Sequence, residues 1–116
     1  MLVREKFIPA GIDSVIAQND NLAAVLMKAL LDEGVRIPQD FGLIGFDNLP
    51  VGECLPVTLS SLYYDKKELA DSVLKVLREK IAGVPEPVRL NCEMKFVSRE
   101  STDKNASHMN MTQDRK

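Results

Sequence analysis

The sequence predicts an α/β fold in which a mostly parallel sheet carries helices on its faces. Short apolar runs of strand length alternate along the chain with segments whose apolar residues recur at helical spacing. Proline, glycine and helix-capping residues separate these segments. Alternation of this kind is typical of parallel strands joined through helices. The 116 residues are enough for one compact domain and too few for two ordinary ones.

The first third of the chain predicts a helix remnant, a strand and a well-formed helix. Residues 1–6 have the pattern of a helix remnant, which the Pro-Ala-Gly sequence at 9–11 ends. The apolar, β-branched run at 14–18 has the length of a strand. Residues 19–21 offer capping side chains, and apolar residues then recur at helical spacing from Leu22. Gly34 is the residue type that commonly follows the end of a helix.

The middle of the chain predicts two further strands. Residues 41–46 form a continuous apolar run, which is typical of a strand covered on both faces. Turn-forming residues at 47–50 close this strand. An irregular segment at 51–56 then leads to a third strand at 58–62.

The last third predicts one more helix and one or two more strands. Asp65 can cap this helix, and Glu68 three residues later gives a pattern similar to a capping box. Apolar residues repeat at four-residue spacing over 69–81, and Gly83 ends the helix. Alternating residues over 88–98 predict strands.

Charge and cysteine content exclude several classes of protein. The chain has 15 basic and 17 acidic residues, and its longest basic run is Lys66–Lys67, so it is not a free-standing nucleic-acid binder. Cys54 and Cys92 stand alone with the single His108, which is neither a zinc pattern nor a disulfide framework. We expect two buried, reduced thiols, no metal and no cofactor. Neither a leader peptide nor a membrane span is visible, which indicates the cytoplasm.

Polar side chains follow the first two predicted strands. Asn19 and Asp20 come after one strand, and Asp47 comes after the next. In an open parallel sheet, ligands bind outside the carboxyl ends of the strands. Carboxylates and amides there suit a small molecule that is rich in hydroxyl or amino groups. Two alternatives stay open, because Asp20 can serve as the helix cap and Asp47 as a turn residue.

No catalytic arrangement competes with a binding site. Ser60 and Ser61 lack a histidine partner in any motif, and His108 falls in the segment predicted to be a tail. The glycines at 42 and 45 lie within a strand and do not form a phosphate-binding fingerprint. We therefore expect a binding protein and not an enzyme.

An ordered set of motifs adds a resemblance to a known family. The matching segments are Ile12–Asp20, Ala23, Ala29-Leu30, Gly34–Asp40, Leu43–Asn48, Pro56, Leu59–Leu62, Leu69 to Gly83 and Phe96–Ser101. Together they resemble the sensor domain of the LacI/GalR family of transcriptional regulators. The resemblance covers residues 12–101 and departs from the family at Ser60-Ser61, where two threonines are usual.

The resemblance implies a type I periplasmic-binding-protein-like fold, present as the C-terminal part of an effector-sensing domain over residues 1–101. It implies a small effector, such as a sugar, bound between two lobes, with Asp47 in contact and Asn19 in the same cleft. It also implies a repressor-type regulator that forms dimers or other homo-oligomers. Such a protein binds operator DNA only through a headpiece absent here, and we expect residues 102–116 to be a disordered polar tail.

Two other classes remain as alternatives. One is the substrate-binding protein of a sugar transporter, which has the same fold. The other is a fragment of an α/β enzyme. A helix-turn-helix upstream would exclude the first, and turnover of a metabolite would favour the second.

Overall fold

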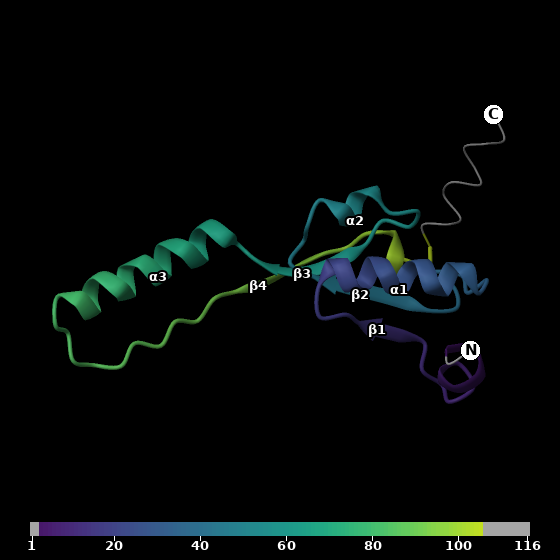
Figure 1. Ribbon diagram of the computed structural model, residues 1–116, viewed down its shortest axis with the longest axis horizontal. Coiled ribbons are helices and arrows are strands. Elements are labelled where there is room, and N and C mark those ends of the chain that lie inside the picture. Colours follow the sequence, from purple (N-terminus) through teal and green to yellow (C-terminus); the bar gives the residue numbers. More distant parts are fainter. Residues whose placement is uncertain (1–2, 106–116) are drawn as a thin grey trace. The chain divides into compact units, whose positions relative to one another are not determined.

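The computed structural model describes residues 3–105, which divide into two compact units. Of the described residues, the first unit contains 3–62 and 96–105, and the second contains Tyr63–Lys95. The elements are η1 (Val3–Phe7, one π-helical turn), β1 (Ser14–Ile16), α1 (Asp20–Asp32), β2 (Gly42–Phe46), α2 (Val51–Cys54), β3 (Ser60–Tyr64), α3 (Lys66–Ile81), β4 (Met94–Val97) and η2 (Glu100–Thr102, a 3-10 turn) (Figure 1).

The strands form one sheet in the order β1-β2-β3-β4, and the first three run parallel. Val15 is in register with Leu43, and Gly45 is in register with Ser61. Because β1, β2 and β3 are parallel neighbours, their carboxyl ends meet at one edge of the sheet. The α/β prediction is confirmed, and the segments that follow β1 and β2 lie at that edge.

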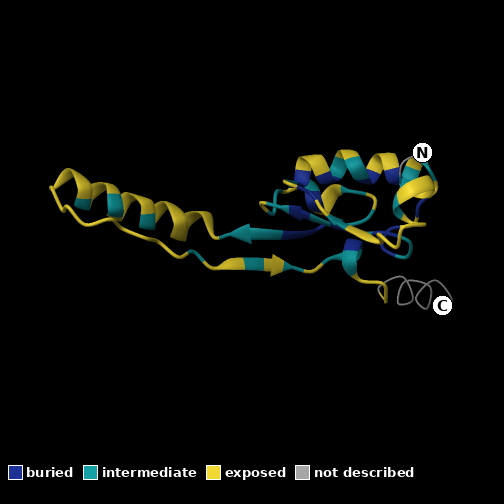
Figure 2. Ribbon diagram, turned by 90° about the horizontal axis from the view of Figure 1, so that it is seen from below, coloured by how far each residue is buried: buried dark blue, intermediate teal, exposed yellow. Residues whose placement is uncertain are grey.

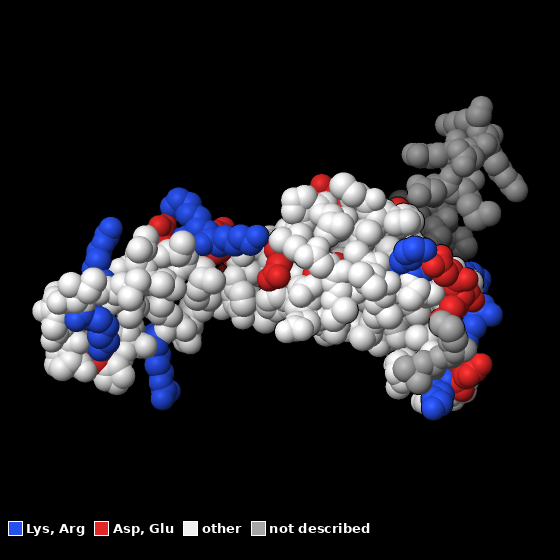
Figure 3. Space-filling view, viewed as in Figure 1, with Lys and Arg blue, Asp and Glu red and all other residues white. Residues whose placement is uncertain are grey.

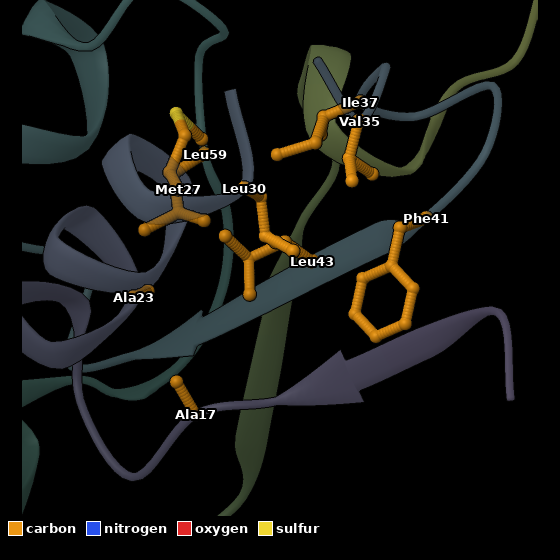
Figure 4. Close-up of a cluster of buried hydrophobic side chains, with 9 residues drawn as sticks. All are labelled: Ala17, Ala23, Met27, Leu30, Val35, Ile37, Phe41, Leu43 and Leu59. Carbon is orange, nitrogen blue, oxygen red and sulfur yellow. The ribbon is translucent and has the colours of Figure 1, made fainter. Parts of the chain in front are cut away.

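Helix α1 covers one face of the sheet. Its buried residues are Asp20, Ala23, Met27 and Leu30, which recur every three or four positions and so share one side of the helix. Leu43 and Leu59, both fully buried, pack with the three apolar ones in the hydrophobic core (Figure 4). The core therefore holds α1 against β2.

The opposite face of the sheet is only partly covered by residues 3–105. Along β2, Leu43 and Gly45 are buried while Ile44 and Phe46 on the other side are half-buried. In β1, Ile16 is 62% exposed. The continuous apolar run at 41–46 predicted cover on both faces, and the described part of the chain supplies it on one.

Several local predictions need correction. Residues 51–54, expected to be irregular, form the short helix α2, because the φ of −54° at Pro50 suits the start of a helical turn. The third strand begins at Ser60 and not at Thr58, whose backbone N–H donates to Glu100. Cys54 is exposed and Cys92 is half-buried, so neither thiol is buried as expected, although both are free.

The end of the chain also differs from expectation. Of the alternating residues at 88–98, only Met94–Val97 form a strand. The predicted tail starts at Thr102, but Thr102 belongs to the turn η2 and its hydroxyl lies 2.6 Å from the Ser60 hydroxyl. The described structure thus extends past residue 101, and residues 106–116 of the predicted tail lie outside the described residues.

The turn after α1 is closed by an ion pair between Arg36 and Asp40. The Asp40 carboxylate accepts hydrogen bonds from Arg36 at the backbone N (2.9 Å), Nε (3.0 Å) and Nη2 (2.7 Å). Those bonds, the side-chain ones foremost, lower the pKa of Asp40 to about 2. The turn connects α1 to the strand that carries Asp47, so its stability matters for the site.

We expect Asp40→Asn to destabilise the fold by about 1 kcal/mol at neutral pH, the upper range for a partly exposed ion pair. The folded-state pKa lies below the unfolded value of about 3.9, so the wild-type advantage is present above pH 4. It is lost as the pH falls from about 4 to about 2. Thermal unfolding of both proteins from pH 7 to pH 2.5 measures this, and an equal difference in Tm at every pH would contradict it.

Helix α3, which belongs to the second unit, has no buried residues. Asp65 caps this helix by accepting from the N–H groups of Lys67 and Glu68, as predicted. Figure 2 shows only exposed and intermediate residues along α3. Its large exposed apolar residues are Leu69, Val73, Leu74, Leu77 and Ile81. These residues form the apolar stripe of α3 that the four-residue spacing predicted. Among the described residues, none covers it enough to bury it.

This stripe leads us to expect that the chain associates with itself, because exposed apolar patches of this kind favour association. Light scattering should give a mass above the 12.9 kDa of one chain. Leu77 is 52% exposed, so Leu77→Glu should shift the mass toward that of one chain without unfolding it. A compact wild-type monomer that binds no dye for apolar surfaces would contradict the expectation.

Candidate functional site

The candidate site is the turn at the carboxyl end of β2. Asp47 has a φ of 95° and Asn48 a φ of 51°, both in the left-handed region. Asp and Asn enter this region more readily than most residues, but two in succession still cost backbone energy. Backbone strain of this kind gathers at binding and catalytic sites, where the surrounding structure enforces it.

Backbone N–H groups of the turn donate to three different partners. Asp47 N donates to Leu62 O at 2.8 Å, and Asn48 N donates to Ser61 Oγ at 3.0 Å. Leu49 N donates to Asp20 Oδ2 at 2.6 Å. Strand β3 and helix α1 therefore impose the conformation of the turn from two sides.

Asp20 is the buried centre of this arrangement. Its side chain is fully buried, and Ser61 Oγ donates to its Oδ1 at 2.7 Å. With Leu49 N on Oδ2, both carboxylate oxygens have hydrogen-bond donors, as a buried carboxylate requires. Asp20 also occupies the first turn of α1, where the helix dipole favours negative charge.

Gly45 makes room for this carboxylate. A Cβ at position 45 would lie 2.1 Å from Asp20 Oδ1 and 2.9 Å from Leu59 Cδ2. No side chain fits at such distances, so the backbone of β2 can approach Asp20 only because residue 45 is glycine. Gly45, which precedes Phe46 and Asp47, therefore allows close packing beneath the site.

The three predicted site residues have different positions. Asn19 is half-buried and caps α1, its Oδ1 accepting from Leu22 N at 2.8 Å. Asp20 is not the N-cap of α1, which the sequence left as an alternative. Its buried carboxylate accepts hydrogen bonds from Leu49 N and Ser61 Oγ instead. Asp47 is exposed, and within residues 3–105 no hydrogen bond or ion pair engages its carboxylate. Of the three, Asp47 alone presents its charge to solvent.

The sequence did not reveal a set of residues that supports the turn from the C-terminal segment. Arg99 donates to Asn48 Oδ1 at 2.9 Å and to Leu59 O at 2.8 Å. Ser101 Oγ accepts from Ser60 N at 2.8 Å and donates to Leu43 O at 2.5 Å. The serine pair and the Arg-Glu-Ser motif were visible in the sequence, but nothing local indicated that they bind each other.

Other kinds of site receive no support from the described residues. Between residues 3 and 105, no group of three or more His, Cys, Asp and Glu side chains is placed to bind a metal ion. In the same range, none of the helices has both the length and the apolar character needed to cross a membrane.

Comparison with known proteins identifies the class. The sequence profile of the family described as a periplasmic binding protein-like domain matches residues 3–102. The chain is 32% identical over 68 residues to the HTH-type transcriptional repressor PurR of Vibrio atlanticus, a match to 59% of this chain and 20% of that protein. It is 34% identical over 92 residues to the ribose operon repressor of Halalkalibacterium halodurans, covering 78% and 28% of the two chains.

Solved structures agree in fold. The transcriptional regulator CelR in complex with cellobiose superimposes with a TM-score of 0.71 and 29% identity over 77% of this chain and 28% of CelR. A LacI-family regulator from Arthrobacter sp. FB24 in complex with lactose gives a TM-score of 0.70 and 32% identity, covering 88% and 38%.

The chain therefore belongs to the family of periplasmic binding protein-like domains. Its relatives place it with the effector-sensing domains of LacI/GalR transcriptional regulators, which confirms the family that the ordered motifs predicted. The chain spans 20% and 28% of the length of the two repressors named above.

Proposed function

We propose that this chain contributes part of the effector site of a transcriptional regulator, and that Asp47 binds a hydroxyl-rich metabolite, a sugar. The observation that carries the proposal is the exposed, unengaged Asp47 carboxylate on a strained turn. A carboxylate in that state can accept hydrogen bonds from two hydroxyl groups. Its position outside the carboxyl end of a parallel strand is where such sheets bind ligands.

The names of relatives support a sugar. CelR was solved with cellobiose, the Arthrobacter regulator with lactose, and one curated relative is a ribose operon repressor. Cellobiose and lactose share vicinal hydroxyl groups, which can donate hydrogen bonds to a carboxylate. We propose the same class of ligand here.

We assign DNA binding to a part of the regulator other than this chain. The chain has a net charge of −2, and the face drawn in Figure 3 shows scattered basic side chains and no continuous basic stripe. Without such a stripe, little free energy comes from the release of counterions on DNA. Regulation and homo-oligomer formation are proposed from the relatives and from the apolar stripe on α3.

The test is sugar binding by the full-length product of the gene, with ribose, glucose, lactose and cellobiose as probes. Wild-type protein should gain thermal stability with at least one of them. Asp47→Asn should weaken its binding ten- to a hundredfold in calorimetric titration, because charge-assisted hydrogen bonds are worth about 1.5–3 kcal/mol. Equal affinity of the two proteins would contradict the proposal and would mean that Asp47 serves only as a turn residue.

A further inference from the structure

The side-chain amide of Asn48 has a hydrogen-bonded oxygen and, within the described residues, an unpaired NH₂ group. Arg99 Nη2 donates to Asn48 Oδ1 at 2.9 Å. Within residues 3–105, no hydrogen bond engages the NH₂ end of this amide. Asn48 is half-buried and directly follows Asp47 in the strained turn.

Arg99 determines which way this amide faces. A guanidinium only donates hydrogen bonds, so the atom that it meets must be the amide oxygen. A flipped amide would set two donors against each other, and the NH₂ end would no longer face away from Arg99. The donor-only chemistry of the Arg99 guanidinium therefore fixes which end of the Asn48 amide faces it.

Arg99 is itself held in place. Its Nη1 donates to Leu59 O at 2.8 Å, and its side chain is 14% exposed. The ion pair with Glu53 is 3.2 Å long, and the Glu53 side chain is 70% exposed, so it adds little. The guanidinium thus joins the backbone of the buried Leu59, the residue before β3, to the side-chain amide of the turn.

We propose that Arg99 is a positioning residue of the ligand site and that Asn48 is a ligand contact that sets specificity. The consecutive residues 47 and 48 offer one free acceptor and one free donor. This pair suits a ligand with a hydroxyl that donates to Asp47 and a neighbouring oxygen that accepts from Asn48. The inference rests on the proposed function and adds a second contact to it.

The first experiment uses the ligand-free protein and compares Arg99→Lys with Glu53→Gln. Lysine keeps the charge but cannot donate from two coplanar nitrogens at once. The Asn48 NH₂ resonances, assigned by their loss in Asn48→Asp, should move toward values for a free amide in Arg99→Lys. They should stay unchanged in Glu53→Gln, which removes only the exposed ion pair. Unmoved resonances in Arg99→Lys would overturn the positioning role.

The second experiment measures affinity for whichever of ribose, glucose, lactose and cellobiose stabilises the wild type. Asn48→Asp keeps an acceptor for Arg99, tolerates the left-handed backbone and removes the donor. It should bind at least about fivefold more weakly, because it loses one hydrogen bond and places a negative charge against the ligand oxygen. Arg99→Lys should weaken binding about fivefold, and Glu53→Gln should stay within twofold of the wild type.

The outcomes separate the inference from the proposed function. If Asp47→Asn loses affinity while Asn48→Asp binds within twofold of the wild type, the proposed function stands and the inference is overturned. If the wild type binds none of the four sugars, the proposed function falls and the contact assigned to Asn48 falls with it. Asn48→Asp decides the contact even where Arg99→Lys does not fold.

Discussion

Replacing Asp47 by glycine should make the protein more stable and abolish its effector binding. The φ of 95° at Asp47 lies outside the range that side chains adopt easily, and glycine adopts it without steric cost. The relief of strain should exceed the entropy that glycine loses on folding, for a net gain of about 0.5–1 kcal/mol. Binding should fall by about a hundredfold or more, because the carboxylate is gone.

The measurement pairs chemical denaturation with sugar titration on the full-length product of the gene. Asp47→Asn is the matched control, since it keeps the shape and the left-handed tolerance and loses only the charge. Asp47→Asn should be as stable as the wild type. Like the glycine variant, it should bind the sugar more weakly than the wild type. A glycine variant that is less stable than the wild type would show that the Asp47 side chain stabilises the turn.

The elements that the sequence predicted well are those specified by nearby residues. Helices α1 and α3 begin at caps, Asn19 and Asp65, whose side chains bind N–H groups two or three residues away. Glycines follow each helix with φ values of 73° at Gly34 and 88° at Gly83. Such signals act within one turn of helix and need no knowledge of the rest of the chain.

The features that the sequence did not predict depend on contacts between distant segments. Asp20 looked like a cap because its neighbours are cap-forming, yet its partner Ser61 lies 41 positions away. The start of β3 moved to Ser60 because the N–H of Thr58 binds Glu100, 42 positions away. The position of Asp47 at a strand end followed from the order of the strands. Its unengaged carboxylate could be found only once its neighbours were in place.

The strongest structural constraint beneath the site is the contact between Gly45 and Asp20, and Gly45→Ala should be among the most damaging small substitutions in the chain. The added Cβ would lie 2.1 Å from Asp20 Oδ1, so the carboxylate must move away from Ser61 Oγ and Leu49 N. Overpacking and the loss of these bonds together should cost about 3 kcal/mol or more. Gly52→Ala is the control, because its nearest neighbour would lie at 3.4 Å in ordinary contact.

A double-mutant cycle separates this contact from a general effect on β2. Asp20→Ala alone should cost about 3–5 kcal/mol, since the Ser61 hydroxyl proton and the Leu49 N–H both lose their acceptor. Because it also removes the atom that alanine 45 would meet, Gly45→Ala should cost about 1–3 kcal/mol less in the Asp20→Ala background. Part of its cost should persist, since Leu59 Cδ2 still lies 2.9 Å from the added Cβ. Urea denaturation of the four proteins measures the coupling. Strictly additive losses would mean that Gly45 is required for a reason other than the buried carboxylate.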